Sequence, residues 1–284
     1  MRNYLKNLNI VGALNVWAEG EIIRYAIESL LFHCNILCIT MDYSDKRTKD
    51  IVTYYQCKYL NRIFTNTTEH RLPPPNKEPF IDKERGVKWR IMRRQKDNIG
   101  LIKQAAFDLV LEQHKKKPID LLYFFDSDEM LTVHAGKTIE AFWESEVDTL
   151  FIRPIECWDD ITVICSQGLI SHARIYKYKP EITSIPHSKQ DYYLPYRKKR
   201  NIWKKPYNYV HLARLTKENQ KLREELRGVR NFDNVKLRRV NKPAYELTYQ
   251  EAHDLLKNDN FIRIKDFEQK YNCDINKVPL TNVN

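Results

Sequence analysis

The most restrictive feature of this chain is an apolar segment that ends abruptly in carboxylates. Residues 119–125 read IDLLYFF, and Asp126, Ser127, Asp128 and Glu129 follow at once. A short apolar run without polar alternation is typical of a strand that is buried on both faces, as in a parallel sheet covered by helices. Ligands of open α/β sheets bind at the carboxyl ends of the strands. The segment therefore predicts an α/β fold with an acidic site at one sheet edge.

The two aspartates are spaced to share one ligand. Side chains alternate along a strand, so Asp126 and Asp128 would point to the same side. Paired carboxylates at a strand end suit Mg²⁺ or Mn²⁺ and leave coordination positions open for substrate phosphates. The same residues are equally compatible with an acidic turn that only faces solvent, so the rest of the chain has to decide between the two interpretations.

Strand-like and helix-like patterns alternate along the first half of the chain. Apolar runs predict strands and 3.6-residue periodicity predicts helices. In chain order the ranges are 8–14 (strand), 19–32 (helix), 35–41 (strand), 46–59 (helix) and 91–114 (helix). This order predicts a mostly parallel sheet with right-handed crossovers and flanking helices, a Rossmann-like arrangement. Residues 65–90 contain Pro73–Pro75 and little periodicity, which predicts a long loop.

Length and composition exclude several classes of protein. A chain of 284 residues suffices for one large domain, or for one domain with an appendage. No apolar stretch is long enough to cross a membrane and residues 1–9 lack a signal-peptide core, which predicts a cytoplasmic protein without a transmembrane segment. None of the seven glycines lies in a GxGxxG or phosphate-loop motif, so dinucleotide oxidoreductases and phosphate-loop kinases are poor candidates. The six scattered cysteines predict reduced thiols.

The charge of the chain favours an anionic partner. The formal net charge is +11 at pH 7, and clustered Lys and Arg attract phosphates. Two basic clusters stand out, at 85–96 and 197–205, and tyrosines surround the second. Basic residues interleaved with aromatics suit the binding of phosphates and the stacking of bases. A solubilising basic face with buried tyrosines explains the same pattern.

Four segments together resemble family 2 glycosyltransferases with the GT-A fold. They are residues 14–23 (LNVWAEGEII), 39–48 (ITMDYSDKRT), 98–100 (NIG) and 125–129 (FDSDE). Their order and spacing carry the resemblance, which covers about residues 8–215. The departure is Ala18, which stands where the family usually has Asn before Glu19.

The resemblance implies a nucleotide-sugar donor, a UDP-sugar in the first instance, and a bound Mn²⁺ or Mg²⁺. Asp126 and Asp128 match the family's Asp-x-Asp motif, and His211, on an apolar segment, suits the histidine that many members add. A histidine in that setting is also compatible with simple packing. Asp42 matches the residue that recognises the base. The expected donor-binding positions are Leu14, Asn15, Glu19, Asp42, Ser44, Arg94, Asn98 and Ser127.

The resemblance also implies inverting transfer with an Asp or Glu as the base, and such transfer needs this base beside the acceptor hydroxyl. Asp160 is the first candidate and Asp159 the second, because Cys157-Trp158-Asp159-Asp160 follows a predicted strand at 149–152 and joins carboxylates to an aromatic that could stack on a sugar. A loop cap is the alternative role for these two acids. The expected acceptor contacts are Trp158, His187, Arg197, Lys198, Arg200 and Trp203.

Three functions remain open on the acceptor side. A basic transferase could glycosylate a hydroxymethylated base in DNA, as found in viruses, with the base leaving its stack. It could instead act on a lipid-linked or surface glycan at the cytoplasmic membrane face. The third option is a nucleic-acid-binding module without catalysis, although buried carboxylates would not help such a protein.

The chain is expected to divide into a catalytic domain at 1–215 and a helical extension at 216–284 that contacts the acceptor or another subunit. Thr216 can cap a helix that runs to Leu226. Thr248 and Glu251 form a capping-box pattern that predicts the start of a second helix.

Overall fold

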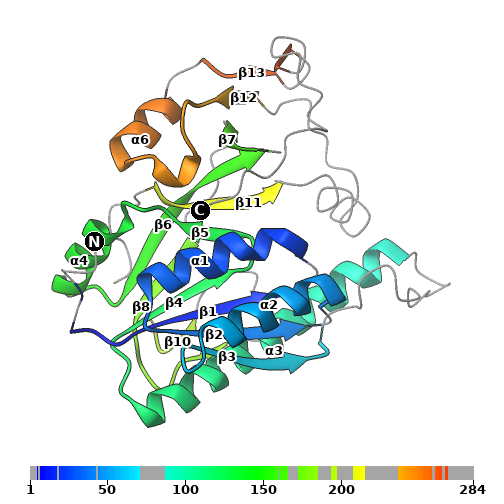
Figure 1. Ribbon diagram of the computed structural model, residues 1–284, viewed down its shortest axis with the longest axis vertical. Coiled ribbons are helices and arrows are strands. Elements are labelled where there is room, and N and C mark those ends of the chain that lie inside the picture. Colours follow the sequence, from blue (N-terminus) through cyan, green and yellow to red (C-terminus); the bar gives the residue numbers. More distant parts are fainter. Residues whose placement is uncertain are drawn as a thin grey trace.

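The computed structural model describes residues 5, 7–17, 19–42, 44–70, 87–158, 160–165, 172–184, 193–196, 207–214, 236–257, 260–263 and 266–267; for 87–99, 194, 207, 213 and 214 it describes the backbone alone. Within these residues the fold is an α/β sheet with helices on both faces, as Figure 1 shows. The predicted fold class is confirmed.

The first half of the chain follows the predicted alternation of strands and helices. Its elements are β1 (Ile10–Val16), the 3-10 turn η1 (Gly20–Ile22), α1 (Ile23–His33), β2 (Ile36–Asp42), α2 (Lys46–Lys58), β3 (Ile63–Thr68), α3 (Val87–Lys116) and β4 (Leu121–Asp126). Strands β4, β1, β2 and β3 are neighbours in that order and all run parallel. Their carboxyl ends therefore share one edge of the sheet.

The second half extends the sheet with antiparallel pairs. Its elements are β5 (Glu129–Leu131), α4 (Ala135–Glu144), β6 (Thr149–Trp158), β7 (Asp160–Cys165), β8 (His172–Lys177), β9 (Thr183–Ser184), β10 (Tyr193–Leu194), β11 (Tyr207–Arg214), β12 (Lys236–Arg239), η3 (Ala244–Glu246), α6 (Tyr249–Lys257) and β13 (Ile262–Arg263). The order is β13-β12-β7-β6-β8-β4-β1-β2-β3, with β11 paired to β5 and β6 and with β9 and β10 in a separate ribbon. The sheet is thus mixed around a parallel core.

Strand β4 has a buried side chain on each face of the sheet. Tyr123 and Phe125 pack into the cluster that includes α1, whereas Leu122 and Phe124 pack into the cluster that includes α3. This two-sided burial is what the apolar run predicted. Gly12 of β1 lies in a crowded part of this core, because a Cβ atom there would lie 3.0 Å from Cδ1 of Leu37 on β2 and 3.5 Å from Cδ1 of Leu30 on α1.

Two segment boundaries differ from the prediction. Residues 65–90 were expected to be a loop, yet they contain the end of β3 and the start of α3. β3 reads IFTNTT and lies at the edge of the sheet, so it lacks the apolar pattern of a central strand. β6 was expected to end at Ile152 but continues to Trp158, because β8, β11 and β7 pair with it in succession.

The described part of the extension is a mixture of strand and helix. β12 pairs with β7, so residues 236–239 belong to the main sheet and were not predicted as a strand. The helix that was predicted after Thr248 is confirmed as α6. The helix predicted from Thr216 to Leu226 lies outside the described residues. The cysteines that the structure describes are free thiols: Cys34, Cys38, Cys57, Cys157 and Cys165. Among the described residues, no helix is long and apolar enough to cross a membrane.

Replacement of Thr248 by alanine is expected to lower the free energy of unfolding by about 1 kcal/mol, as for other N-cap losses. The Oγ1 atom of Thr248 accepts a hydrogen bond from the Glu251 N–H at 3.2 Å, and Oε2 of Glu251 accepts one from the Thr248 N–H at 2.7 Å. Urea unfolding measures the loss. Thr248→Ser keeps the hydroxyl and should stay close to the parent, so equal losses for both variants would contradict the capping role.

Candidate functional site

The acidic turn lies where β4 ends and β5 begins. Asp126 is the last residue of β4, and its partner in the next strand, β1, is Asn15. The carboxylate side chain of Asp126 is 40% exposed, whereas that of Asp128 is 6% exposed. The turn therefore places one open and one buried carboxylate at the carboxyl edge of the parallel strands, where the sequence predicted them.

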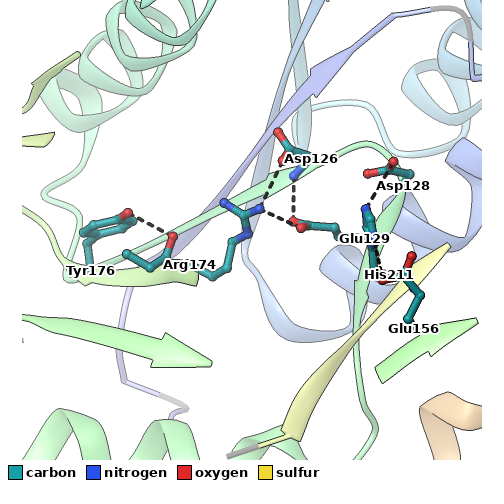
Figure 2. Close-up of polar contacts among 8 residues, drawn as sticks. Asp126, Asp128, Glu129, Glu156, Arg174, Tyr176 and His211 are labelled. Atoms are coloured by element: carbon teal, nitrogen blue, oxygen red, sulfur yellow. Dashed lines mark hydrogen bonds and ion pairs between the residues drawn. The ribbon is translucent and has the colours of Figure 1, made fainter. Parts of the chain in front are cut away.

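A buried arginine anchors the first carboxylate. Arg174 lies on β8, and its Nη2 atom is 3.0 Å from Oδ2 of Asp126 and 2.6 Å from Oε1 of Glu129 (Figure 2). Oε2 of Glu129 also accepts a hydrogen bond from the Asp126 N–H at 3.0 Å. Burial raises the pKa of Glu129 to about 7, even though the Arg174 cation acts to lower it. Arg174 and Glu129 together fix the backbone and side chain of Asp126.

A histidine accompanies the second carboxylate. His211 lies on β11, which places it directly between Glu129 of β5 and Glu156 of β6 in the strand register. Its Nε2 atom is 3.5 Å from Oδ2 of Asp128, and its Nδ1 atom is 3.5 Å from Oε2 of Glu156 (Figure 2). Burial acts to lower the pKa of His211, but the carboxylates of Asp128 and Glu156 outweigh it and raise the pKa to about 10.

The sequence prediction missed three members of this cluster. Arg174, Glu129 and Glu156 are all buried, with side chains 3% exposed. A buried charge needs a partner of opposite charge, so these three buried residues indicate that an ionic network lies under the turn. The available signal was a charged residue inside an apolar strand, as in the sequence HARIYK around Arg174. Their proximity arises from the pairing of β8 with β4 and of β11 with β5 and β6, which no local pattern shows.

The donor set at the turn is chemically suited to a divalent cation. Carboxylate oxygens are preferred by Mg²⁺ and Mn²⁺, and imidazole is a common ligand of transition metals. Asp126, Asp128 and His211 provide these donor types within one cluster. In the part of the chain that the structure describes, no three such side chains are arranged in metal-ligand geometry. Ion binding would therefore need the oxygens of Asp126 and Asp128 and the Nε2 atom of His211 to move closer together.

The predicted donor-binding residues occupy the same sheet edge. Asp42 ends β2 and is fully buried, with Oδ1 accepting hydrogen bonds from Oγ1 of Thr68 and the N–H of His70, each at 2.7 Å. Asn15 is buried, and its Oδ1 atom has no hydrogen-bond partner among the described residues. Ser44 donates to the carbonyl of Val16 at 3.5 Å. These contacts join the ends of β1, β2 and β3 into one polar edge.

The first two family-like segments meet at this edge. Oγ1 of Thr48 accepts a hydrogen bond from the Gly20 N–H at 2.9 Å, and Oδ1 of Asp45 caps α2 by accepting from the Thr48 N–H at 2.7 Å. Glu19 precedes η1 and is partly exposed. Leu14 is fully buried in the core, and Ser127 is buried in the acidic turn.

The predicted catalytic and acceptor residues are only partly described. Asp160 starts β7, and its Oδ1 atom accepts hydrogen bonds from the N–H and Oγ1 of Thr162 at 2.7 and 2.9 Å. Trp158 ends β6 and is 5% exposed. The predicted donor-binding residues Arg94 and Asn98 are described by their backbone alone. The predicted catalytic residue Asp159 and the predicted acceptor contacts His187, Arg197 and Lys198 lie outside the described part. Arg200 and Trp203 also lie outside it.

Comparisons with known proteins give distant structural matches. No family model matches the chain, and no curated protein matches it. One similar solved structure is 4-diphosphocytidyl-2C-methyl-D-erythritol synthase from Anaerococcus prevotii, with 9% identity, a TM-score of 0.32, and coverage of 61% of this chain and 72% of that one. Another is mouse xyloside xylosyltransferase 1 in its apo form, with 15% identity, a TM-score of 0.26, and coverage of 51% and 53%. At these values the likeness does not bear on the chemistry of this chain, and the function has to be argued from the site.

Proposed function

We propose that this protein is a metal-dependent glycosyltransferase that moves a sugar from a nucleotide-sugar to an acceptor hydroxyl. The observation that carries the proposal is that Asp126 and Asp128, with His211 beside Asp128, lie at the carboxyl edge of the parallel strands. Strand pairing brings His211 to the turn from a distant part of the chain. An acidic turn that only faced solvent would not need a buried Asp128, nor a buried arginine and a partly buried histidine beside its carboxylates.

The chain's own residues have defined roles in this proposal. Asp126, Asp128 and His211 would hold Mn²⁺ or Mg²⁺, and this ion would act as a Lewis acid toward the diphosphate leaving group. Arg174 fixes the carboxylate of Asp126 and adds positive charge below the turn. Asn15, Asp42 and Ser44 line the adjoining edge, where the nucleoside would lie. Asp160 remains the first candidate for the base, with Asp159 second.

The donor and the acceptor are the finer parts of the proposal. The resemblance to family 2 glycosyltransferases favours a UDP-sugar and inversion at the transferred carbon. The net charge of +11 favours an anionic acceptor. DNA that carries a hydroxymethylated base fits this charge and offers a free hydroxyl, so it is the acceptor to test first. Glycans on a lipid carrier are the alternative acceptor.

The test is release of nucleoside diphosphate from a panel of sugar nucleotides with Mn²⁺ or Mg²⁺, with and without hydroxymethylated DNA. Metal-dependent release that DNA accelerates, together with a matching mass increase of the DNA, is the expected result. Release that DNA leaves unchanged would keep the transferase and direct the search to glycan acceptors. Absence of release with every donor and metal would overturn the proposal.

A further inference from the structure

The second ring nitrogen of His211 faces a carboxylate that the proposed transfer reaction does not use. Nε2 of His211 is directed at Asp128, and Nδ1 is 3.5 Å from Oε2 of Glu156. The side chain of Glu156 is 3% exposed, and Figure 2 shows it on the side of His211 away from Asp128. A buried carboxylate behind a histidine that faces an acidic site requires an explanation, because burying such a charge is costly.

The strand register holds this arrangement in place. His211 of β11 is the direct partner of Glu156 in the parallel pair with β6, so the two side chains leave the sheet on the same face. The N–H of Leu212 donates to the carbonyl of Asp128 at 2.6 Å, which ties the next residue of β11 to the turn. Asp128, His211 and Glu156 therefore form an ordered row of acid, imidazole and acid.

We propose that Glu156 is a positioning residue for a metal-binding His211. The inference rests on the proposed function, because it assumes that the acidic turn binds a divalent cation. Histidines that bind metals usually donate their other ring N–H to a carboxylate, which sets the tautomer and orients the ring. With Oε2 of Glu156 at 3.5 Å from Nδ1, Glu156 would accept from Nδ1 once the metal is bound and leave Nε2 as the ligand atom, on the side of Asp128. Glu156 itself would not touch the cation.

The proposal predicts the Mn²⁺ affinity of two single variants and of their combination. Loss of a carboxylate behind a metal-binding histidine lowers metal affinity about 10- to 100-fold. We expect Glu156→Gln to weaken Mn²⁺ binding at least about 10-fold, as measured by the electron paramagnetic resonance signal of free Mn²⁺. Because Glu156 acts through His211, the double variant Glu156→Gln/His211→Gln should bind Mn²⁺ no more weakly than His211→Gln alone.

Controls separate this role from a general effect on folding. Asp148→Asn removes a carboxylate that pairs with Lys179 at 2.9 Å away from the acidic turn, and it should leave Mn²⁺ affinity unchanged. Thermal unfolding of every variant reports any loss of structure. If Glu156→Gln does not fold, Glu156→Asp keeps the charge but shortens its reach, and it should still weaken Mn²⁺ binding severalfold.

The outcomes distinguish this inference from the proposed function. If the parent protein binds Mn²⁺, Asp128→Ala abolishes binding and Glu156→Gln binds as the parent does, the positioning role is overturned while the metal site stands. Effects of Glu156→Gln and His211→Gln that multiply in the double variant would also overturn it. If the parent protein binds no Mn²⁺, both the metal site and the role of Glu156 are overturned.

Discussion

Asp128→Ala is expected to lower the rate of metal-dependent nucleoside diphosphate release about 1,000-fold, the loss typical when one preorganised stabilising group is removed from an active site. The side chain of Asp128 is 6% exposed and lies 3.5 Å from Nε2 of His211. Its removal takes away one of the two carboxylates of the turn. It also leaves His211 beside Glu156 without the acid that it faces. The measurement is product release at saturating Mn²⁺ with the best donor of the panel.

The same variant separates an enzyme from a protein that only binds anions. A binding module should keep or improve its affinity for DNA when Asp128 is lost, because a negative charge disappears. An enzyme should lose turnover whatever its affinity for the acceptor. Asp148→Asn is the matched control and should turn over at the parent rate. An Asp128→Ala protein that folds normally and releases product at the parent rate would contradict the assignment of the acidic turn as the active site.

The sequence predicted the parallel core and the acidic turn because both are encoded locally. The apolar segment at 119–125 and the carboxylates after it are contiguous, and strand polarity alone places them at the sheet edge. Asp42 and Asn15 reach that edge for the same reason. The capping box at Thr248 is another local signal, and the hydrogen bonds of α6 confirm it.

The ionic network could not be predicted because it depends on strand register between distant segments. Arg174 meets Asp126 only because β8 pairs with β4, and Glu156 meets His211 only because β11 pairs with β6. A shift of one residue in either pairing would turn these side chains to the other face of the sheet. β3 was not predicted for a different reason. It lies at the edge of the sheet, where a strand can carry polar side chains, so its sequence lacks the apolar pattern of a core strand.

Arg174→Met is expected to lower the free energy of unfolding by about 3 to 5 kcal/mol at pH 8, because it leaves a buried carboxylate without its cation. Glu129 is 3% exposed on its side chain and lies 2.6 Å from Arg174. Urea unfolding in the presence of a chelator measures this effect without bound metal. Lys179→Met removes a partly exposed ion pair with Asp148, and it should cost less than about 1 kcal/mol.

The loss of unfolding free energy caused by Arg174→Met should depend on pH, because it depends on whether Glu129 is protonated. The folded-state pKa of Glu129 is about 7, above its ordinary value of 4.5, so its protonated form favours folding. The stability that this group contributes is full below pH 4.5 and is lost as the pH rises through 7. Without Arg174 the folded-state pKa rises further, so the defect should be smaller at pH 5.5 than at pH 8.

Adding Glu129→Gln to Arg174→Met tests whether the unpaired charge is the cause. The double variant should recover much of the lost stability at pH 8, because an amide is cheaper to bury than a carboxylate. A loss that is equal at pH 5.5 and pH 8 and that Glu129→Gln does not reduce would show that packing of the arginine, not its charge, matters. Since apolar residues can often replace a buried ion pair without loss of stability, recovery in the double variant would indicate that Arg174 and Glu129 serve the geometry of Asp126 and not the stability of the fold.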